Sequence, residues 1–354
     1  HAREHLAPGP LRSLLMDPAV EEVLVNGAMF PDGGYSPVVR DGYGEIVHWE
    51  PFHADLMERL RAEHGVALGT EEARRELVFL FGLAAHGMAD QIFDGVYLTR
   101  SRVYEAEAWA SGSVDTASDV AMVAQVGAQP LVDAWAPWET VREVLAEGGH
   151  EVEVTTMQAG QASLRLAIAW MRVTGSDPAQ AAPYVAQFPW ANGHLLDAEV
   201  PGSPQCIGAA VARYWEAMWE KWEGGYDVDR RLIVASWPEE GSDGHPLEAS
   251  SIEATVSLVL STALREGSLE GRVRVVDEEG VEVPVAAELY YGDRSNVLNV
   301  WPEEDWREGV RYTVTLLPGL ETEGGEVVGE AQSVDFWAGA GPVVDAPGPR
   351  DGRC

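Results

Sequence analysis

The hydrophobic pattern changes its period near residue 225, and this change constrains the fold more than any other feature of the chain. Before it, apolar residues recur at three- and four-residue spacing, which is typical of helices that bury one face. Such patterns cover residues 51–64, 71–93, 138–146, 161–173 and 207–222. After residue 247, apolar and polar residues alternate in 252–258, 271–275 and 312–316, which indicates short strands. We therefore expect a multi-domain protein, an all-α helical bundle followed by an all-β sandwich.

The stretch between the two patterns is rich in turn formers. Gly224 and Gly225 open it, and Pro238, Gly241 and further Gly and Pro residues follow. We predict a helical domain over residues 1–225, a linker over 226–247, a β domain over 248–340 and a flexible tail over 341–354. Both larger parts are long enough to bury a core, so we expect the helical domain to fold without the β domain.

The charge of the chain narrows the choice of partner. The 24 Lys and Arg face 58 Asp and Glu, which gives a formal net charge of −34. Such an acidic field repels polyanions, so we expect no nucleic acid partner. No apolar run approaches the roughly 20 residues that cross a bilayer, so we expect no transmembrane segment. Cys206 and Cys354 are the only cysteines, and a metal site must therefore use His and carboxylate ligands.

One helical pattern carries a possible metal site. His86, Asp90 and Asp94 follow each other at four-residue spacing within the apolar run, so all three can face one cavity. A carboxylate in such surroundings needs a partner. The residues alone leave a hydrogen-bonded structural pair and a metal site equally open. Asp115 and Asp119 repeat the spacing, although in so acidic a chain a solvated helix face is the better interpretation of this pair taken alone.

Three blocks resemble the zinc-dependent phospholipase C superfamily, most closely the catalytic domain of glycosylphosphatidylinositol-specific phospholipase D. They are Phe30-Pro31-Asp32, His48-Trp49-Glu50-Pro51-Phe52, and residues 79–90 with the sequence FLFGLAAHGMAD. The resemblance covers residues 1 to about 125 and implies a helical bundle with three metals. The second part resembles bacterial Ig-like domains of the SbsA type, on Leu260-Ser261-Thr262-Ala263-Leu264, the 276–280 hairpin and residues 308–314.

The resemblance implies which residues hold the metals. The first metal, Zn²⁺, takes Asp32, His48, His86 and Asp90. The third uses His1, with Asp90 as a bridging ligand. At the second metal the family has two histidines and a carboxylate, and this chain has Asp94, Asp115 and Asp119. An all-oxygen site favours Mg²⁺, Ca²⁺ or Mn²⁺ over zinc.

These assignments imply a metal-dependent phosphoester hydrolase that acts on phospholipid or glycolipid headgroups at a membrane surface. In this function Asp32 is the catalytic residue and orients or deprotonates the attacking water. The alternatives are a P1-type nuclease and a degenerate, non-catalytic metal-binding or adhesive surface protein.

The ends of the chain and the Ig-like resemblance bear on location. We expect a secreted or bacterial cell-surface protein. His1 fits a trimmed precursor, and Cys354, after a run rich in Pro and Gly, fits a lipid or cell-wall attachment point.

Overall fold

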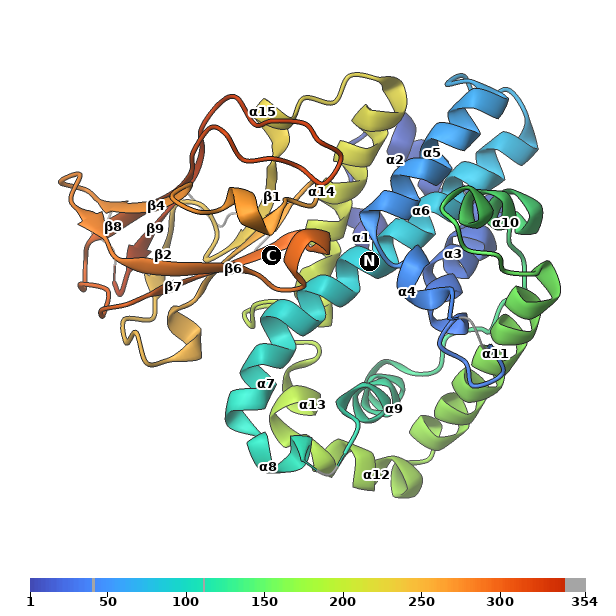
Figure 1. Cartoon of the computed structure of the whole chain (residues 1–354). Coiled ribbons are helices and arrows are strands. Elements are labelled where there is room, and N and C mark those ends of the chain that lie inside the picture. Colours follow the sequence, from blue (N-terminus) through green and yellow to red (C-terminus); the bar gives the residue numbers. More distant parts are fainter. Residues whose placement is uncertain (40–41, 111, 341–354) are drawn as a thin grey trace.

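The computed structural model describes residues 1–39, 42–110 and 112–340, and it has a helical part followed by a β part (Figure 1). The α-helices precede residue 232, and the strands, with three short 3-10 helices among them, lie between residues 233 and 338. The predicted order of the two classes is thus confirmed. The expected tail 341–354, with Cys354, lies outside the described residues.

The five helical patterns found in the sequence coincide with α5, α6, α10, α11 and α14. The starts of these helices follow local chemistry. Pro51 occupies the first turn of α5, and the side chain of Ser203 accepts the backbone N–H of Cys206 at the start of α14. The α-helices are α1 (Ala2–His5), α2 (Pro10–Leu15), α3 (Glu21–Gly33), α4 (Gly44–Val47), α5 (Glu50–His64), α6 (Glu71–Ile92), α7 (Thr99–Tyr104), α8 (Ala106–Trp109), α9 (Val114–Val126), α10 (Trp138–Glu147), α11 (Val154–Ser176), α12 (Pro178–Gln187), α13 (Pro189–His194), α14 (Pro204–Glu223) and α15 (Val228–Arg231).

Helix α6 forms the centre of the helical part, and α3 crosses it at very short range. A Cβ atom on Gly82 would lie 2.2 Å from the carbonyl oxygen of Leu24, and one on Gly27 would lie 2.2 Å from that of Phe79. Only glycine fits at this crossing. The close approach brings the end of α3, with Asp32, alongside the part of α6 that carries His86.

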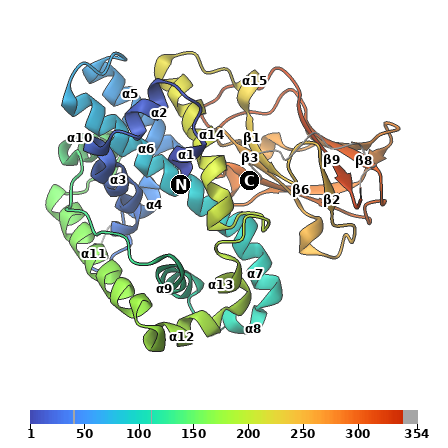
Figure 2. The ribbon, with the colours of Figure 1, turned by 180° about the vertical axis from the view of Figure 1, so that it is seen from behind.

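Beyond α6 the chain continues as a π-helix, η2 (Phe93–Leu98), which leads into α7. Seen from behind, α9 lies within an arc made by α11, α12 and α13 (Figure 2). The helices of the described part include none that is both long and apolar enough to cross a membrane.

The β part contains two sheets. The first has the order β1-β3-β7-β6 and is antiparallel throughout; the second has the order β2-β9-β8-β4-β5, with β2 parallel to β9. The predicted turn at residues 277–280 follows β4, and Asp277 accepts the backbone N–H groups of Glu279 and Val281. The strands are β1 (Ile233–Trp237), β2 (Ser242–His245), β3 (Val256–Leu260), β4 (Val273–Asp277), β5 (Glu282–Val283), β6 (Val285–Leu289), β7 (Val297–Pro302), β8 (Arg311–Leu316) and β9 (Gln332–Ala338).

The central strands of the first sheet, β3 and β7, are buried on both faces. Leu258 and Leu298 pack into the core of the β part, together with Phe336 of the second sheet. Their chain neighbours Val259 and Val297 point the other way and pack into the core of the helical part. Alternation along the strands therefore joins the sheet to two cores at once.

The stretch 226–247, expected as a linker, instead contains α15, β1 and β2. Val234, Ala235 and Trp237 of β1 belong to the core of the helical part, because this edge strand packs against α14. The turn-forming glycines and prolines that suggested a linker lie between these short elements. This stretch holds the two parts together rather than separating them.

Buried polar contacts also join the two parts. The carboxylate of Glu50 at the start of α5 accepts Lys221 Nζ at 2.6 Å and the backbone N–H of Ala263 at 2.6 Å. Asn299 of β7 donates to the carbonyl oxygen of Gly95 in η2 at 3.0 Å. Because buried polar groups of this kind need their partners, the β part and α6–η2 depend on each other.

Candidate metal centre

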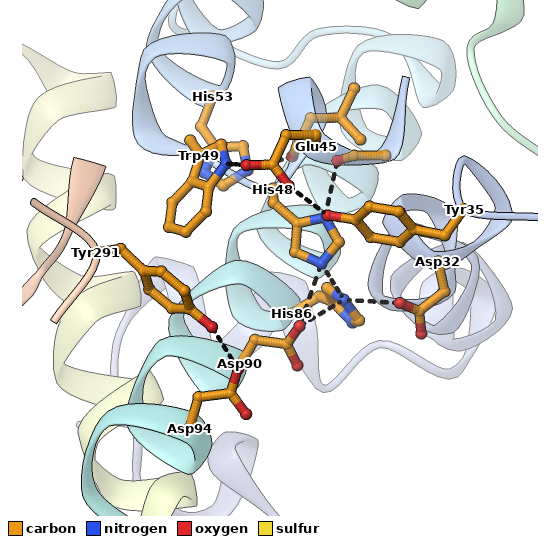
Figure 3. Close-up of polar contacts among 12 residues, drawn as sticks. Asp32, Tyr35, Glu45, His48, Trp49, His53, His86, Asp90, Asp94 and Tyr291 are labelled. Carbon is orange, nitrogen blue, oxygen red and sulfur yellow. Dashed lines mark hydrogen bonds and ion pairs between the residues drawn. The ribbon is translucent and has the colours of Figure 1, made fainter. Parts of the chain in front are cut away.

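Four of the predicted ligands converge, and they come from three places in the chain. Asp32 lies near the end of α3, His48 follows α4, and His86 and Asp90 are one turn apart on α6 (Figure 3). The Nε2 atoms of His48 and His86 are 2.9 Å apart. Asp90 Oδ2 lies 3.2 Å from His48 Nε2 and 3.4 Å from His86 Nε2, and Asp32 Oδ1 lies 3.4 Å from His86 Nε2.

The backbone fixes the orientation of His48. Its Nδ1–H donates to the carbonyl oxygen of Gly44 at 2.8 Å, so the lone pair of Nε2 faces the cluster. Gly87 lets the His48 backbone rest on α6, because a Cβ there would lie 2.1 Å from the His48 carbonyl oxygen. His53, near this segment, is buried, and its Nε2–H donates to the carbonyl oxygen of Val47. Burial lowers the pKa of His53 to about 4, so this imidazole is neutral.

The cluster is strongly coupled electrostatically. Burial opposes a charge on His86, but the carboxylates of Asp90 and Asp32 raise its pKa well above the usual value. Burial likewise opposes a charge on Asp90, yet His86 and His48 hold its pKa far below the usual value. The positive charge that these carboxylates favour is the charge that a bound cation would supply.

The donor set and its spacing fit a zinc ion. Tetrahedral ligands at about 2.0–2.2 Å from zinc lie about 3.3 Å from one another. The four distances measured among the side chains, 2.9 to 3.4 Å, are close to this value. Asp32, His48 and His86 each offer one ligand atom, and these three atoms all lie within 4.8 Å of one another.

The cluster faces a cavity of about 620 Å³. Its lining contains both acidic and aromatic side chains. The residues are Asp32, Tyr35, Glu45, His48, Trp49, Gly87, Ala89, Asp90, Gln91, Phe93, Asp94, Asp115, Ser118, Asp119, Met122, Leu195, Pro204, Ile207 and Tyr291.

The predicted second-metal ligands line the same cavity without forming a compact group. Asp94 belongs to η2, and Asp115 and Asp119 to α9. Burial raises the pKa of Asp94 to about 6 against the effect of a hydrogen bond from Tyr291, and burial together with Asp32, Asp115 and Asp90 raises that of Asp119 to about 7. Burial and the carboxylates of Asp90 and Asp32 also raise the pKa of Asp115. Each of these carboxyl groups therefore holds its proton to a higher pH than usual, and a cation bound between them would favour their ionised forms.

The structure does not bring His1 to the cluster. Its Nε2 lies 2.9 Å from the carbonyl oxygen of Gln205, and its Nδ1 lies 3.2 Å from a carboxylate oxygen of Glu4. His1 is absent from the lining of the cavity described above. The bridging ligand set implied by the resemblance, His1 with Asp90, is therefore not assembled.

Sequence reasoning missed the aromatic side of the cavity. Tyr35 donates to Glu45 at 2.9 Å, and Trp49 Nε1–H donates to the same carboxylate at 3.1 Å. Tyr291 donates to Asp94 from the loop after β6. The block that contains His48 and Trp49 could have suggested Trp49, but no local pattern links Tyr291 to a residue 197 positions away.

Comparisons with known proteins add little to this description. No protein-family model matches the chain, and no curated protein matches it. The S-layer protein rSbsC(31-844) is similar at 10% identity and a TM-score of 0.25, over 85% of this chain and 46% of that one. The N-terminal part of the bacterial S-layer protein SbsC is similar at 10% identity and a TM-score of 0.22, over 83% of this chain and 78% of that one. TM-scores this low carry no argument about fold or function.

Proposed function

We propose that this protein is a metal-dependent phosphoester hydrolase that acts on phospholipid or glycolipid headgroups outside the cell or at its surface. In this proposal the helical part is of the zinc-dependent phospholipase C type and the β part is an Ig-like sandwich. One observation carries it: Asp32, His48, His86 and Asp90 converge at zinc-like spacing beside an open cavity. A merely structural hydrogen-bonded pair needs two such groups, whereas here both carboxylates lie within 3.4 Å of an imidazole nitrogen and the two imidazoles lie 2.9 Å apart.

The chain's own residues would hold the ion and prepare the water. His48 and His86 present ring nitrogens to it, and Gly44 keeps His48 in the required tautomer. A zinc ion held there supplies Lewis-acid chemistry, which makes water nucleophilic near neutral pH and offsets charge on phosphoryl oxygens. The side chain of Asp32 is 48% exposed, so its free oxygen can accept a proton from water in the cavity.

Three aspartates of the lining, Asp94, Asp115 and Asp119, could bind a second, harder cation. Asp94, Asp115 and Asp119 offer only oxygen ligands, which Mg²⁺, Ca²⁺ and Mn²⁺ prefer. Metal supplementation of the purified protein tests this assignment. Activity that rises with Mg²⁺, Ca²⁺ or Mn²⁺ in addition to zinc supports it, and activity that depends on zinc alone contradicts it.

The function is tested with the full chain after loading with zinc. Hydrolysis of phospholipid vesicles, of a glycosylphosphatidylinositol and of single-stranded DNA is measured in parallel, with a chelator and with the variant His86→Ala. We expect lipid headgroup release that the chelator abolishes and that His86→Ala lowers by at least 100-fold. The variant His150→Ala, at an exposed position outside the cavity, is the matched control.

Three other results would reject the proposal. Cleavage of single-stranded DNA in place of lipid would indicate a nuclease. Zinc binding with no hydrolysis of any substrate would indicate a non-catalytic metal-binding protein. Equal activity of His86→Ala and wild type would show that the cluster is not the site of reaction.

A further inference from the structure

The β part contributes one residue, Tyr291, to the lining of the cavity of the proposed hydrolase. The loop between β6 and β7 brings Tyr291 against the helical part, where its hydroxyl donates to Asp94 (Figure 3). Its ring packs edge-on against Trp49, with 5.0 Å between the ring centroids, and against Tyr290 at 4.6 Å. From the same loop Arg294 Nη1 lies 3.0 Å from Glu45 Oε1. Two side chains of this loop thus contact residues that line the cavity, Asp94 and Glu45.

Hydrogen bonds hold the loop in place. The backbone N–H of Asn296 donates to Gln91 Oε1 at 2.6 Å, and Asn296 Nδ2 donates to the carbonyl oxygen of Leu260 at 3.1 Å. The same amide group lies 3.2 Å from a carboxylate oxygen of Glu50. Because these contacts are buried and join α5, α6 and β3 to the loop, Tyr291 is presented from a rigid support.

The position of Tyr291 suits contact with a phosphate. Asp94 lies four residues after Asp90, in the π-helix that continues α6, and Asp90, Asp94 and Tyr291 line the same cavity. The other hydroxyl and indole donors of the lining donate to residues other than Asp90 and Asp94. Tyr35 and Trp49 donate to Glu45, and Ser118 donates to Asn192. Tyr291 is 40% exposed, and its hydroxyl points into an acidic cavity in which an anion needs donors.

We propose that Tyr291 binds the phosphate of the substrate, so that the β part supplies part of the substrate-binding site. The identity of the ligand rests on the function proposed above. The phenol O–H turns from Asp94 to a phosphoryl oxygen while Trp49 and Tyr290 keep the ring in place. The β part is then a component of the site and not a spacer.

The variant Tyr291→Phe tests this inference, with Tyr104→Phe as its matched control. Tyr104 also donates to a carboxylate across the boundary between the two parts, Glu253 at 2.8 Å, but it does not line the cavity. Binding of inorganic phosphate to the zinc-loaded full chain is measured by calorimetry. We expect Tyr291→Phe to weaken this binding about 10-fold and to raise KM for lipid similarly, with kcat changed less than 3-fold. Zinc content and thermal unfolding should match wild type, and Tyr104→Phe should change none of these values.

Several results would overturn the inference. They are phosphate affinity in Tyr291→Phe equal to wild type, equal losses in both variants, loss of zinc from Tyr291→Phe, or a wild-type protein that does not bind phosphate. The calorimetry does not depend on turnover, so its outcome is separate from the proposed function. Phosphate binding that needs Tyr291 in a protein without hydrolysis supports this inference and rejects the function. Lipid hydrolysis that Tyr291→Phe leaves unchanged supports the proposed function and rejects this inference.

Discussion

Gly87 shows how closely the backbone must pack to assemble the candidate metal centre. It lies on α6 between the candidate ligands His86 and Asp90, and the chain at His48 rests directly on it. A side chain at this position would push the His48 carbonyl, and with it the imidazole, away from α6. The ligands alone therefore do not make the site, because their spacing depends on this glycine.

We predict that Gly87→Ala weakens zinc binding by at least 10-fold while the protein stays folded. The added Cβ would lie 2.1 Å from the His48 carbonyl oxygen, a distance that must be relieved by movement of the His48 segment. Zinc affinity measured by competition with a chromophoric chelator checks this. The control is Gly193→Ala in α13, where a Cβ meets nothing within 4 Å. Wild-type affinity in Gly87→Ala would contradict the packing described here.

At the same scale, the sequence predicted part of the site and missed the rest. Asp32, His48, His86 and Asp90 stand in recognisable blocks, and their convergence agrees with the ligand set implied by the resemblance. His1 carried only the weak signal of being an early histidine, and it bonds to the backbone of α14 instead. Tyr291 gave no signal at all, since its role follows from how two parts of the chain pack.

Among the elements, β2 contains a buried histidine with a defined electrostatic role. His245 Nε2–H donates to the carbonyl oxygen of Ala254 at 3.0 Å, and its ring packs edge-on against Phe336 at 4.7 Å. Burial lowers the pKa of His245 to about 4, with Arg100 acting in the same direction and Glu253 and the hydrogen bond to Ala254 acting against it. The folded protein therefore holds this imidazole neutral at pH values where the unfolded chain binds a proton.

The consequence is a loss of stability in mild acid. The folded pKa is lower than the unfolded value of about 6.5, so the contribution is fully present above pH 6.5 and is lost as the pH falls to about 4. Its full size is about 3 kcal/mol. We predict that His245→Gln flattens the fall in unfolding free energy between pH 6.5 and 4, measured with urea, whereas His150→Gln at an exposed position does not. An unchanged slope in His245→Gln would count against this role.

Element types were predictable where the period was strong. Helices α5, α6, α10, α11 and α14 lie where the three- and four-residue spacing indicated them. The π-helix η2 could not be predicted, because the apolar pattern of residues 93–98 fits an ordinary α-helix equally well. Strands β1 and β2 were hidden among glycines and prolines, since short edge strands tolerate turn formers close to their ends.

At the scale of the whole molecule, the two parts share a hydrophobic core. Val234, Trp237 and Val259 pack with the helices, and Glu50 is satisfied by groups from the β part. From this shared packing we expect, against the prediction made from the sequence, that the helical part does not fold alone. The change of period in the sequence marks a change from helices to strands. Periodicity does not show whether the apolar faces of those helices and strands pack against each other.

We predict that a chain ending at residue 230 is insoluble or unfolds without cooperativity. The cut removes the apolar side chains of β1, β3 and β7 from the helical core, and it leaves the buried carboxylate of Glu50 without Ala263, Thr262 and Asn296. Loss of such partners costs several kcal/mol against a total stability of about 5–15 kcal/mol. Circular dichroism and thermal unfolding of the purified fragment check this. A soluble fragment with one sharp transition would show that the shared core is dispensable.

The central claim is that Asp32, His48, His86 and Asp90 together hold a metal ion. Anomalous X-ray scattering at the zinc edge, from crystals of the full chain grown with zinc, tests it most directly. We expect one strong peak about 2.0–2.2 Å from Asp32 Oδ1, His48 Nε2, His86 Nε2 and Asp90 Oδ2, and no such peak in crystals of His86→Ala. A zinc-soaked wild-type crystal with no peak among these four atoms would contradict the claim.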